Sequence, residues 1–542
     1  MPVQLDLADI QGNVLTAYGK LGFPKGRFLL FQVIRADAGR GFIEMLRPWI
    51  TTALRWESSR RPHLHGPVQQ ARPEVTVNLA FTFMGLYALG VPTRTLRDMP
   101  DEFIDGMEAR ANIIGDDVPT NPRSNWDQVW RTPAGGRQPV HILVSLNAQM
   151  QSNGMPVPAL ATMTERLLAF CAGSDGGIRL LPGHAGPNPD FQEAAALLRQ
   201  DASGVMQPLP VEHFGYRDGI SDPVFNGQYP PEREAEHVAG NGKLTPQQTW
   251  EPLATGEFLL GYPDEAQEQA GMAMSIDFSR NGTFMAYRKL HQNVVAFRRY
   301  LATTSAAFAT VYGIPLAQAP ETLMAKIAGR WPDGVPLVLA PTYGEWQAIK
   351  ARRATAQAAN DTATIAAMER DLTRFLFRQD PDGSKCPFSA HIRRANTRDM
   401  LDPHFASANP SEWNGSVLNN RRRILRRGLP YGAASPDAPD DSGEHGIVML
   451  IVCASLFRQF EFVQQQWIQY GLDFFAGNDT CPLIGNHGLE AKFVIAADPK
   501  SGRPPFICDR PPQFVETRGG EYFFVPSMTA LRMIGTGVID PT

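Results

Sequence analysis

The fold is decided by three short runs of sequence, RFLLFQVI at residues 27–34, TVNLAFTF at 76–83 and HILVSLN at 141–147. Each run is rich in apolar, β-branched and aromatic residues, which is the composition of a buried strand. Helical patterns follow the first run over residues 41–56 and the third run over 161–172, and residues 177–181 form a further short strand. The resulting order, β-α-β-β-α-β, is that of the ferredoxin-like unit.

The second half of the chain shows a similar order of elements. Its pattern predicts strands at residues 283–289 (TFMAYRK), 446–454 (GIVMLIVCA) and 522–526 (YFFVP), and helices at 294–312 and 456–470. We therefore predict an α+β protein of two ferredoxin-like domains, with antiparallel sheets and helices, at residues 1–207 and 208–542. An alanine-rich stretch at about 341–375 is expected to form an inserted helical arm without chemistry.

Composition excludes several classes of function. The 542-residue chain has a net charge of −4, which gives no electrostatic reason to expect nucleic acid or an anionic membrane as a partner. Its five cysteines are spread singly, which argues against a disulfide framework, a zinc ribbon and covalently attached haem. We find no signal peptide or twin-arginine pattern at the N-terminus and no apolar run of membrane-spanning length, so we expect a cytoplasmic protein.

Three local constellations in the second half carry residues suited to chemistry. In FGYRDGISDP at 214–223, Gly215 and Gly219 bracket Asp218, so a sharp turn presents a carboxylate that can act as an acid or a base. In CPFSAHIRRAN at 386–396, His391 is a candidate ligand for haem iron, and the arginines at 393 and 394 suit haem propionates. Cys386 in the same motif is an alternative thiolate ligand.

The third constellation is RRRILRRGLPYG at residues 421–432, with five arginines in seven positions. Such a run is usually a solvated or anion-binding patch, but Ile424 and Leu425 indicate a chain that enters a core and carries an arginine inward. Taken singly, each constellation has a plain alternative: an ordinary turn, a structural histidine, or a surface patch.

Together and in this order, the three motifs resemble the dye-decolorizing peroxidase family. The resemblance extends to DIQGN at 9–13, TVNLAFTFMGLYAL at 76–89, GRWPDG at 329–334 and TRGGEYFF at 517–524. It implies two ferredoxin-like domains of the dimeric α+β barrel type, with one non-covalent haem b per chain in the C-terminal domain. It also implies a peroxidase that reduces hydrogen peroxide and oxidises bulky aromatic donors such as anthraquinone dyes and phenols.

The resemblance also assigns roles to individual residues. It makes His391 the proximal iron ligand, and Asp218 with Arg426 the pair that acts on peroxide. Arg393, Arg426, Gly215 and Gly219 are expected to contact the haem. If the motif is aligned one residue out of register, Arg427 takes the place of Arg426.

A carboxylate should accept the second N–H of His391, and Glu461 is the best candidate because it lies beside the apolar stripe of its helix. A glutamate at the edge of the core that forms an ion pair remains the alternative.

The sequence departs from the family pattern at two places. Gly428 stands where compact relatives have an asparagine, and Arg426 lies 35 positions after His391, a long interval that indicates an insertion near 404–420. Iron removal from haem and a non-enzymatic haem carrier or sensor are alternative functions for the same pocket. The sequence leaves open whether the protein is a monomer or a dimer.

Overall fold

The computed structural model describes residues 3–56, 69–133, 136, 139–271, 273, 275–435 and 437–539. The first half forms β1 (Lys25–Val33), α2 (Ala36–Leu46), β2 (Val75–Phe81), β3 (Ile142–Ala148), α7 (Ala159–Gly173) and β4 (Ile178–Leu180). All neighbouring strands are antiparallel, and their order across the sheet is β4-β1-β3-β2. This order confirms the ferredoxin-like unit predicted for the first half.

The helix predicted at 41–56 was wrong in its position. Helix α2 begins at Ala36 and ends at Leu46, where a 3₁₀ turn at Arg47–Trp49 follows. Pro48 in that turn lacks the N–H that a continuing helix would need, so the apolar residues beyond it do not extend the helix.

The second half repeats the unit. Its elements are β10 (Thr283–Gln292), α10 (Val294–Tyr312), β11 (Leu425–Gly432), β12 (His445–Cys453), a π-helix at Leu456–Glu461 that continues over Val463–Ile468, and β15 (Val515–Val525). The strands lie in the order β11-β12-β10-β15, the same topology as in the first half. Strand β11 was not predicted, because its two central arginines made the run look like a surface patch.

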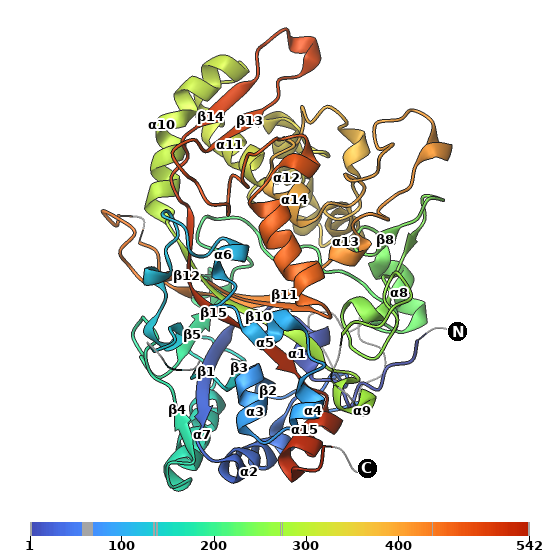
Figure 1. The fold of residues 1–542 in the computed structure, drawn as a ribbon. Coiled ribbons are helices and arrows are strands. Elements are labelled where there is room, and N and C mark those ends of the chain that lie inside the picture. The colour runs from blue at the N-terminus through green and yellow to red at the C-terminus, as the bar shows by residue number, and fades with distance from the viewer. Residues whose placement is uncertain are drawn as a thin grey trace.

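The two units share one sheet. Strand β15 pairs with β2 at Phe524 and Phe81, which gives the continuous order β11-β12-β10-β15-β2-β3-β1-β4. Strand β5 (Gln192–Ala195) pairs with β1 and also lies alongside β11. The sheet therefore bends toward closure, as in a barrel, because β5 of the first unit meets β11 at the far end of the second. The strands of both units are seen across the middle of Figure 1.

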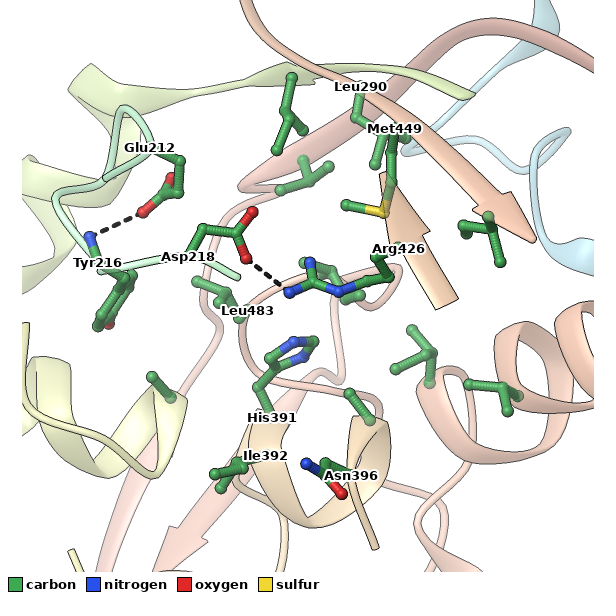
Figure 2. A pocket seen from close by; sticks show the side chains of 18 of the residues that line it. Glu212, Tyr216, Asp218, Leu290, His391, Ile392, Asn396, Arg426, Met449 and Leu483 are labelled. Atoms are coloured by element: carbon green, nitrogen blue, oxygen red, sulfur yellow. Dashed lines mark hydrogen bonds and ion pairs between the residues drawn. The ribbon is translucent and has the colours of Figure 1, made fainter. Parts of the chain in front are cut away.

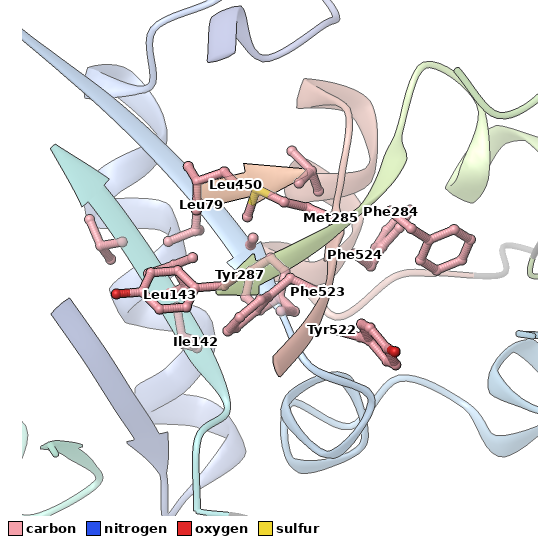
Figure 3. Packing of buried hydrophobic residues seen from close by; sticks show 14 of the residues in the cluster. Leu79, Ile142, Leu143, Phe284, Met285, Tyr287, Leu450, Tyr522, Phe523 and Phe524 are labelled. Carbon is pink, nitrogen blue, oxygen red and sulfur yellow. The ribbon is translucent and has the colours of Figure 1, made fainter. Parts of the chain in front are cut away.

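Side chains from both units fill the core of this curved sheet. Leu79, Ile142 and Leu143 of the first unit pack with Tyr287 and Leu450 of the second (Figure 3). A second apolar cluster lies around α10, α11 (Ala319–Ala328) and α14 (His391–Ala395). These helices lie on the opposite side of the sheet from α2, α7 and α15 (Met528–Thr536) (Figure 1).

The remaining elements are short, apart from the inserted arm. The arm consists of α12 (Tyr343–Ala358) and α13 (Thr362–Asp371), so the helical character predicted for 341–375 is observed. The short helices are α1 (Gly12–Leu15), α3 (Phe83–Ala88), α4 (Thr93–Leu96), α5 (Asp101–Asp105), α6 (Ala111–Ile114), α8 (Pro231–Val238) and α9 (Ile276–Ser279). The short strands are β6 (Leu198–Gln200), β7 (Met206–Pro208), β8 (Lys243–Leu244), β9 (Trp250–Glu251), β13 (Lys492–Ile495) and β14 (Phe506–Asp509). Across the described ranges, every helix is too short or too polar to span a bilayer.

Candidate active site

A cavity of about 280 Å³ lies between the sheet of the second unit and the helices that cover it. This volume is close to the lower end of the range typical of small-molecule sites, about 300–1,000 Å³. Alternate residues of the strands line the cavity: Arg288, Leu290 and Gln292 of β10, Arg426 of β11, Ile447, Met449 and Ile451 of β12, and Val515 and Thr517 of β15. Side chains of the π-helix and of α14 form the opposite wall.

Strand β12 has a continuous apolar sequence because both of its faces are buried. Val448, Leu450 and Val452 pack into the core, whereas the intervening residues line the cavity. A strand with one face in water would alternate with polar residues instead. The buried strand predicted from this run thus forms one wall of the site.

A tight turn presents Asp218 to the cavity. Gly215 and Gly219 have φ angles of +97° and +67°, which favour glycine, so the two glycines permit the turn. Glu212 fixes the same turn, because its carboxylate accepts hydrogen bonds from the backbone N–H groups of Phe214 and Tyr216, each at 2.9 Å. Figure 2 shows the bond to Tyr216. Sequence reasoning missed Glu212, since no spacing rule marks a glutamate that binds the backbone of a turn.

Arg426 forms an ion pair with Asp218, with 2.6 Å between Nη2 and Oδ1 (Figure 2). The alternation of β11 selects this arginine, because Arg426 faces the cavity and its neighbour Arg427 faces the other side. Arg427 donates instead to the backbone carbonyls of Asn13 and Val14. The choice between the two arginines therefore follows from the pleat of one strand.

Asp218 and Arg426 each stabilise the ionised form of the other. Burial is the largest single influence and acts to raise the pKa of Asp218, but the charge and hydrogen bond of Arg426, together with the Gly219 N–H and the charge of Lys20, hold that pKa below its ordinary value. The Asp218 carboxylate in turn raises the pKa of Arg426. More than a third of each side chain is exposed, and both line the cavity. The pair is thus charged and open to a small molecule in the cavity.

His391 lies across the cavity from this pair. It begins the five-residue helix α14, and its imidazole is directed toward Asp218 and Arg426 (Figure 2). Burial, followed by the charge of Arg426, lowers the pKa of His391 to about 4. The ring is therefore neutral near neutral pH, which is the form that binds a metal.

The proximal hydrogen bond differs from the prediction. His391 Nδ1 lies 3.3 Å from the Sγ atom of Cys481, and burial raises the pKa of that thiol. Glu461 instead receives two hydrogen bonds from Arg110, at 2.5 and 2.7 Å, and one from the Tyr522 hydroxyl at 2.8 Å. The predicted bond between Glu461 and His391 is wrong, because the glutamate is turned toward the first unit and engaged there.

Arg393, which was expected to contact a cofactor, does not line the cavity. Arg393 is fully buried, and its guanidinium lies 2.7 Å from Asp380 Oδ2. It also packs against the rings of Phe377 and Phe388. Its remaining nitrogen atoms donate to the Cys386 carbonyl and the Met400 sulfur, so all three are engaged away from the cavity. Of the two glycines assigned to the cofactor, Gly219 lines the cavity, whereas Gly215 is exposed outside it.

The alternative ligand Cys386 and two further histidines do not reach the cavity. Cys386 is buried elsewhere, and burial raises the pKa of its thiol to about 11. His213 and His291 each bind a backbone carbonyl, those of Tyr431 and Asp441. Among the histidines that the structure describes, His391 is the one that lines the cavity.

The long interval between His391 and Arg426 does not obstruct the site. No described residue between 404 and 420 lines the main cavity, so the insertion folds away from it. Gly428 faces the backbone, where a Cβ atom would lie 2.1 Å from the carbonyl oxygen of Val448. Any larger side chain at this position would therefore collide with β12.

Three arginines near the cavity, of which two are buried and one is partly buried, indicate an anionic ligand. Arg330 and Arg423 line the cavity, and Arg398 is close enough to both for their charges to lower its pKa further than burial alone. Burial lowers the pKa of Arg330 to about 9 and that of Arg423 to about 10. None of the three has an ion pair with a carboxylate among the described residues, and Nε and Nη2 of Arg398 lack hydrogen-bond partners there. Buried cations normally require a counter-charge.

These features fit a haem. A neutral histidine on one wall can bind the iron, and uncompensated arginines can bind propionates. The arginine donors that lack a counter-charge are therefore those that the two carboxylates of a haem would satisfy.

Comparisons with known proteins agree with this architecture. Residues 9–154 match the family model described as the DyP dimeric alpha+beta barrel domain. The chain is 29% identical to Peroxidase 2 of Mycetinis scorodonius, with 98% of this chain and 88% of that protein covered. It is 27% identical to a dye-decolorizing peroxidase of Mycena epipterygia, with 98% and 87% covered.

Solved structures show the same fold. The crystal structure of a fungal DyP-type peroxidase from Auricularia auricula-judae matches with a TM-score of 0.69 at 22% identity, covering 99% of this chain and 100% of that one. A dye-decolorizing peroxidase in complex with 2,6-dimethoxyphenol matches with a TM-score of 0.66 at 23% identity, over 98% and 100%. With the ordered motifs and the doubled ferredoxin-like topology, these matches show that residues 9–154 carry the DyP dimeric alpha+beta barrel domain and that nearly the whole chain is similar to dye-decolorizing peroxidases.

Proposed function

We propose that the protein is a haem-dependent peroxidase that reduces hydrogen peroxide and oxidises aromatic donors such as anthraquinone dyes and phenols. One observation carries the proposal: a neutral histidine and a charged aspartate–arginine pair face each other across one cavity. A haem carrier would need the histidine but not an acid–base group opposite it. The names of the relatives from Mycetinis and Mycena support the same activity.

His391 would hold one non-covalent haem b through Nε2, and Arg330 and Arg423 would bind its propionates. The haem, when bound, supplies the iron and the electron-transfer chemistry of the reaction. The chain supplies the orientation of this group and the charges around it.

Asp218 would move the proton. Its ionised carboxylate can accept a proton from one oxygen of peroxide and return it to the other, which leaves as water. Arg426 stays protonated at any ordinary pH, so it cannot exchange protons, but it can stabilise the negative charge that develops as the O–O bond breaks. The 2.6 Å ion pair keeps both groups on the same side of the cavity.

Dye oxidation by the haem-loaded protein tests the proposal. We expect peroxide-dependent bleaching of an anthraquinone dye by the wild-type protein, and its loss in His391→Ala together with most of the haem absorption. His404→Ala serves as the matched control, because that histidine is half exposed and outside the cavity. Full activity and an unchanged spectrum in His391→Ala would contradict the ligand assignment. Release of free protoporphyrin without dye oxidation would contradict the proposed reaction.

A further inference from the structure

The thiol of Cys481 is an unusual neighbour for a histidine that binds a metal. A metal-bound histidine ordinarily donates its second N–H to a carboxylate, a backbone carbonyl or water, and this bond fixes the ring and raises its basicity. Here Nδ1 of His391 lies 3.3 Å from Cys481 Sγ. Thiol sulfur is a weak hydrogen-bond acceptor.

Cys481 is held firmly in this place. It is fully buried, and its backbone N–H donates to the carbonyl oxygen of Ile468 at 2.7 Å. Its own carbonyl accepts a hydrogen bond from the N–H of Gly485 at 2.9 Å and lies 3.0 Å from Nε2 of His487. These contacts fix the backbone that carries the Cys481 side chain, which is enclosed in the apolar cluster beside the imidazole.

The same geometry leaves the other ring nitrogen free for the cavity. The Cys481 sulfur contacts Nδ1, whereas the ring as a whole is directed toward Asp218 and Arg426 (Figure 2). An acceptor at Nδ1 selects the tautomer in which Nδ1 carries the proton and Nε2 presents its lone pair. Glu461, the carboxylate predicted for this role, is occupied by Arg110 and Tyr522.

We propose that Cys481 is the positioning residue for His391, and that its sulfur accepts the Nδ1–H bond that a carboxylate would otherwise accept. The inference rests on the proposed function for its effect on iron. A weak acceptor leaves the imidazole less electron-rich than a carboxylate would. The ferric/ferrous potential of the bound haem is therefore higher than it would be with a carboxylate at this position.

Three substitutions at one position test this idea. In Cys481→Asp a carboxylate replaces the thiol, in Cys481→Ser a near-isosteric hydroxyl does so, and in Cys481→Ala the partner is removed. The matched control is Cys508→Ala, because Cys508 is buried in the same apolar cluster and is not a partner of His391. Spectroelectrochemistry gives the potential, and resonance Raman spectroscopy of the ferrous protein gives the iron–histidine stretching frequency.

We expect Cys481→Asp to shift the reduction equilibrium at least tenfold toward the ferric form, which is about 59 mV for one electron. Its iron–histidine frequency should rise, Cys481→Ser should shift both quantities less in the same direction, and Cys481→Ala should lower the frequency. Cys508→Ala should change neither. If Cys481→Asp fails to fold, the serine variant carries the test. A folded, haem-loaded carboxylate or serine variant with the wild-type potential and frequency would overturn the inference.

A measurement without haem separates this inference from the proposed function. In the haem-free protein, ¹⁵N NMR of the His391 imidazole reports which nitrogen carries the proton. We expect Cys481→Ala, but not Cys508→Ala, to change the populations of the two tautomers. Unchanged tautomers in Cys481→Ala would overturn the positioning role. Failure of the wild-type protein to bind haem, with the tautomer shift present, would instead count against the proposed function alone.

Discussion

Asp218 is subject to two opposing influences, and their balance makes a prediction about pH. Burial favours the neutral acid, whereas Arg426, the Gly219 N–H and Lys20 together favour the carboxylate and prevail. A carboxylate acts as a base only while it is ionised, so activity is lost as the pH falls through its pKa. Because that pKa lies below the ordinary value of about 3.9, we predict an acidic optimum for dye oxidation, at about pH 3–5.

Substitution of Arg426 should reverse that balance. In Arg426→Leu burial is no longer opposed by the arginine, so the pKa of Asp218 rises and the acidic limb of the pH–rate profile moves to higher pH. Arg427→Leu is the control, because Arg427 faces the other side of β11 and binds the backbone of Asn13 and Val14. Rates of reaction with peroxide measured from about pH 3 to 7 provide the test. An acidic limb that stays in place in Arg426→Leu would show that the arginine does not govern the carboxylate.

Arg393 should prove important for stability rather than for cofactor contact. In Arg393→Met the carboxylate of Asp380 stays buried without its partner, and breaking such a pair costs about 3–5 kcal/mol. Urea denaturation monitored by tryptophan fluorescence measures this loss in the free energy of unfolding. A variant of wild-type stability that binds haem weakly would instead support the haem contact first expected of Arg393.

At the scale of elements, the sequence predicted those strands and helices whose apolar side chains follow one regular period. Helix α10 lies at the predicted residues, and β12 is within one residue of its prediction. Strand β11 was missed because its side chains serve three environments: Leu425 enters the core, Arg426 the cavity, and Arg427 the N-terminal segment. Motifs brought His391, Asp218 and Arg426 together, but no pattern revealed Cys481, since its contact joins residues 90 positions apart.

The inserted arm has a structural task that its composition did not indicate. Trp346 of α12 stacks on Trp331, which lines the cavity, with 4.4 Å between ring centroids. Glu369 of α13 forms an ion pair with Arg217, the residue before Asp218. The arm therefore supports both the wall of the cavity and the turn that carries the carboxylate.

Removal of the Trp346 ring should loosen this support. Trp346 is 5% exposed, so we predict that Trp346→Ala lowers the free energy of unfolding by about 3–5 kcal/mol. Tyr87→Ala, an exposed aromatic residue on α3, should change it by no more than about 0.5 kcal/mol. Chemical denaturation compares the two variants. Equal effects would mean that the arm is only loosely attached.

Across the whole molecule, buried ion pairs join the two units. Arg288 and Lys289 of β10 pair with Asp116 and Asp127 of the first unit. Arg110 pairs with Glu461 of the π-helix, whose neighbours line the cavity. If the two units were separated, each of these charged side chains would lose its partner. The division at residues 207 and 208 is thus a proposal about topology, and we do not expect either part to fold alone.

Glu461→Ala tests this coupling. Arg110 and the Tyr522 hydroxyl would lose a buried carboxylate, so we predict a loss of about 3–5 kcal/mol in the free energy of unfolding. Tryptophan fluorescence and haem absorption should still report one coincident transition, because the sheet is continuous. The ferric/ferrous potential should stay close to that of the wild-type protein. A large shift in potential with unchanged stability would restore the direct link to His391.

The central claim is that Asp218 and Arg426 act on peroxide at a haem held by His391. Stopped-flow absorption tests it most directly, when the ferric protein is mixed with one equivalent of hydrogen peroxide. We predict a rapid change in the haem spectrum of the wild-type protein, slowed by a factor on the order of 10²–10⁴ in Asp218→Asn and in Arg426→Leu. Wild-type rates in both variants, or no spectral change in the wild-type protein, would contradict the claim.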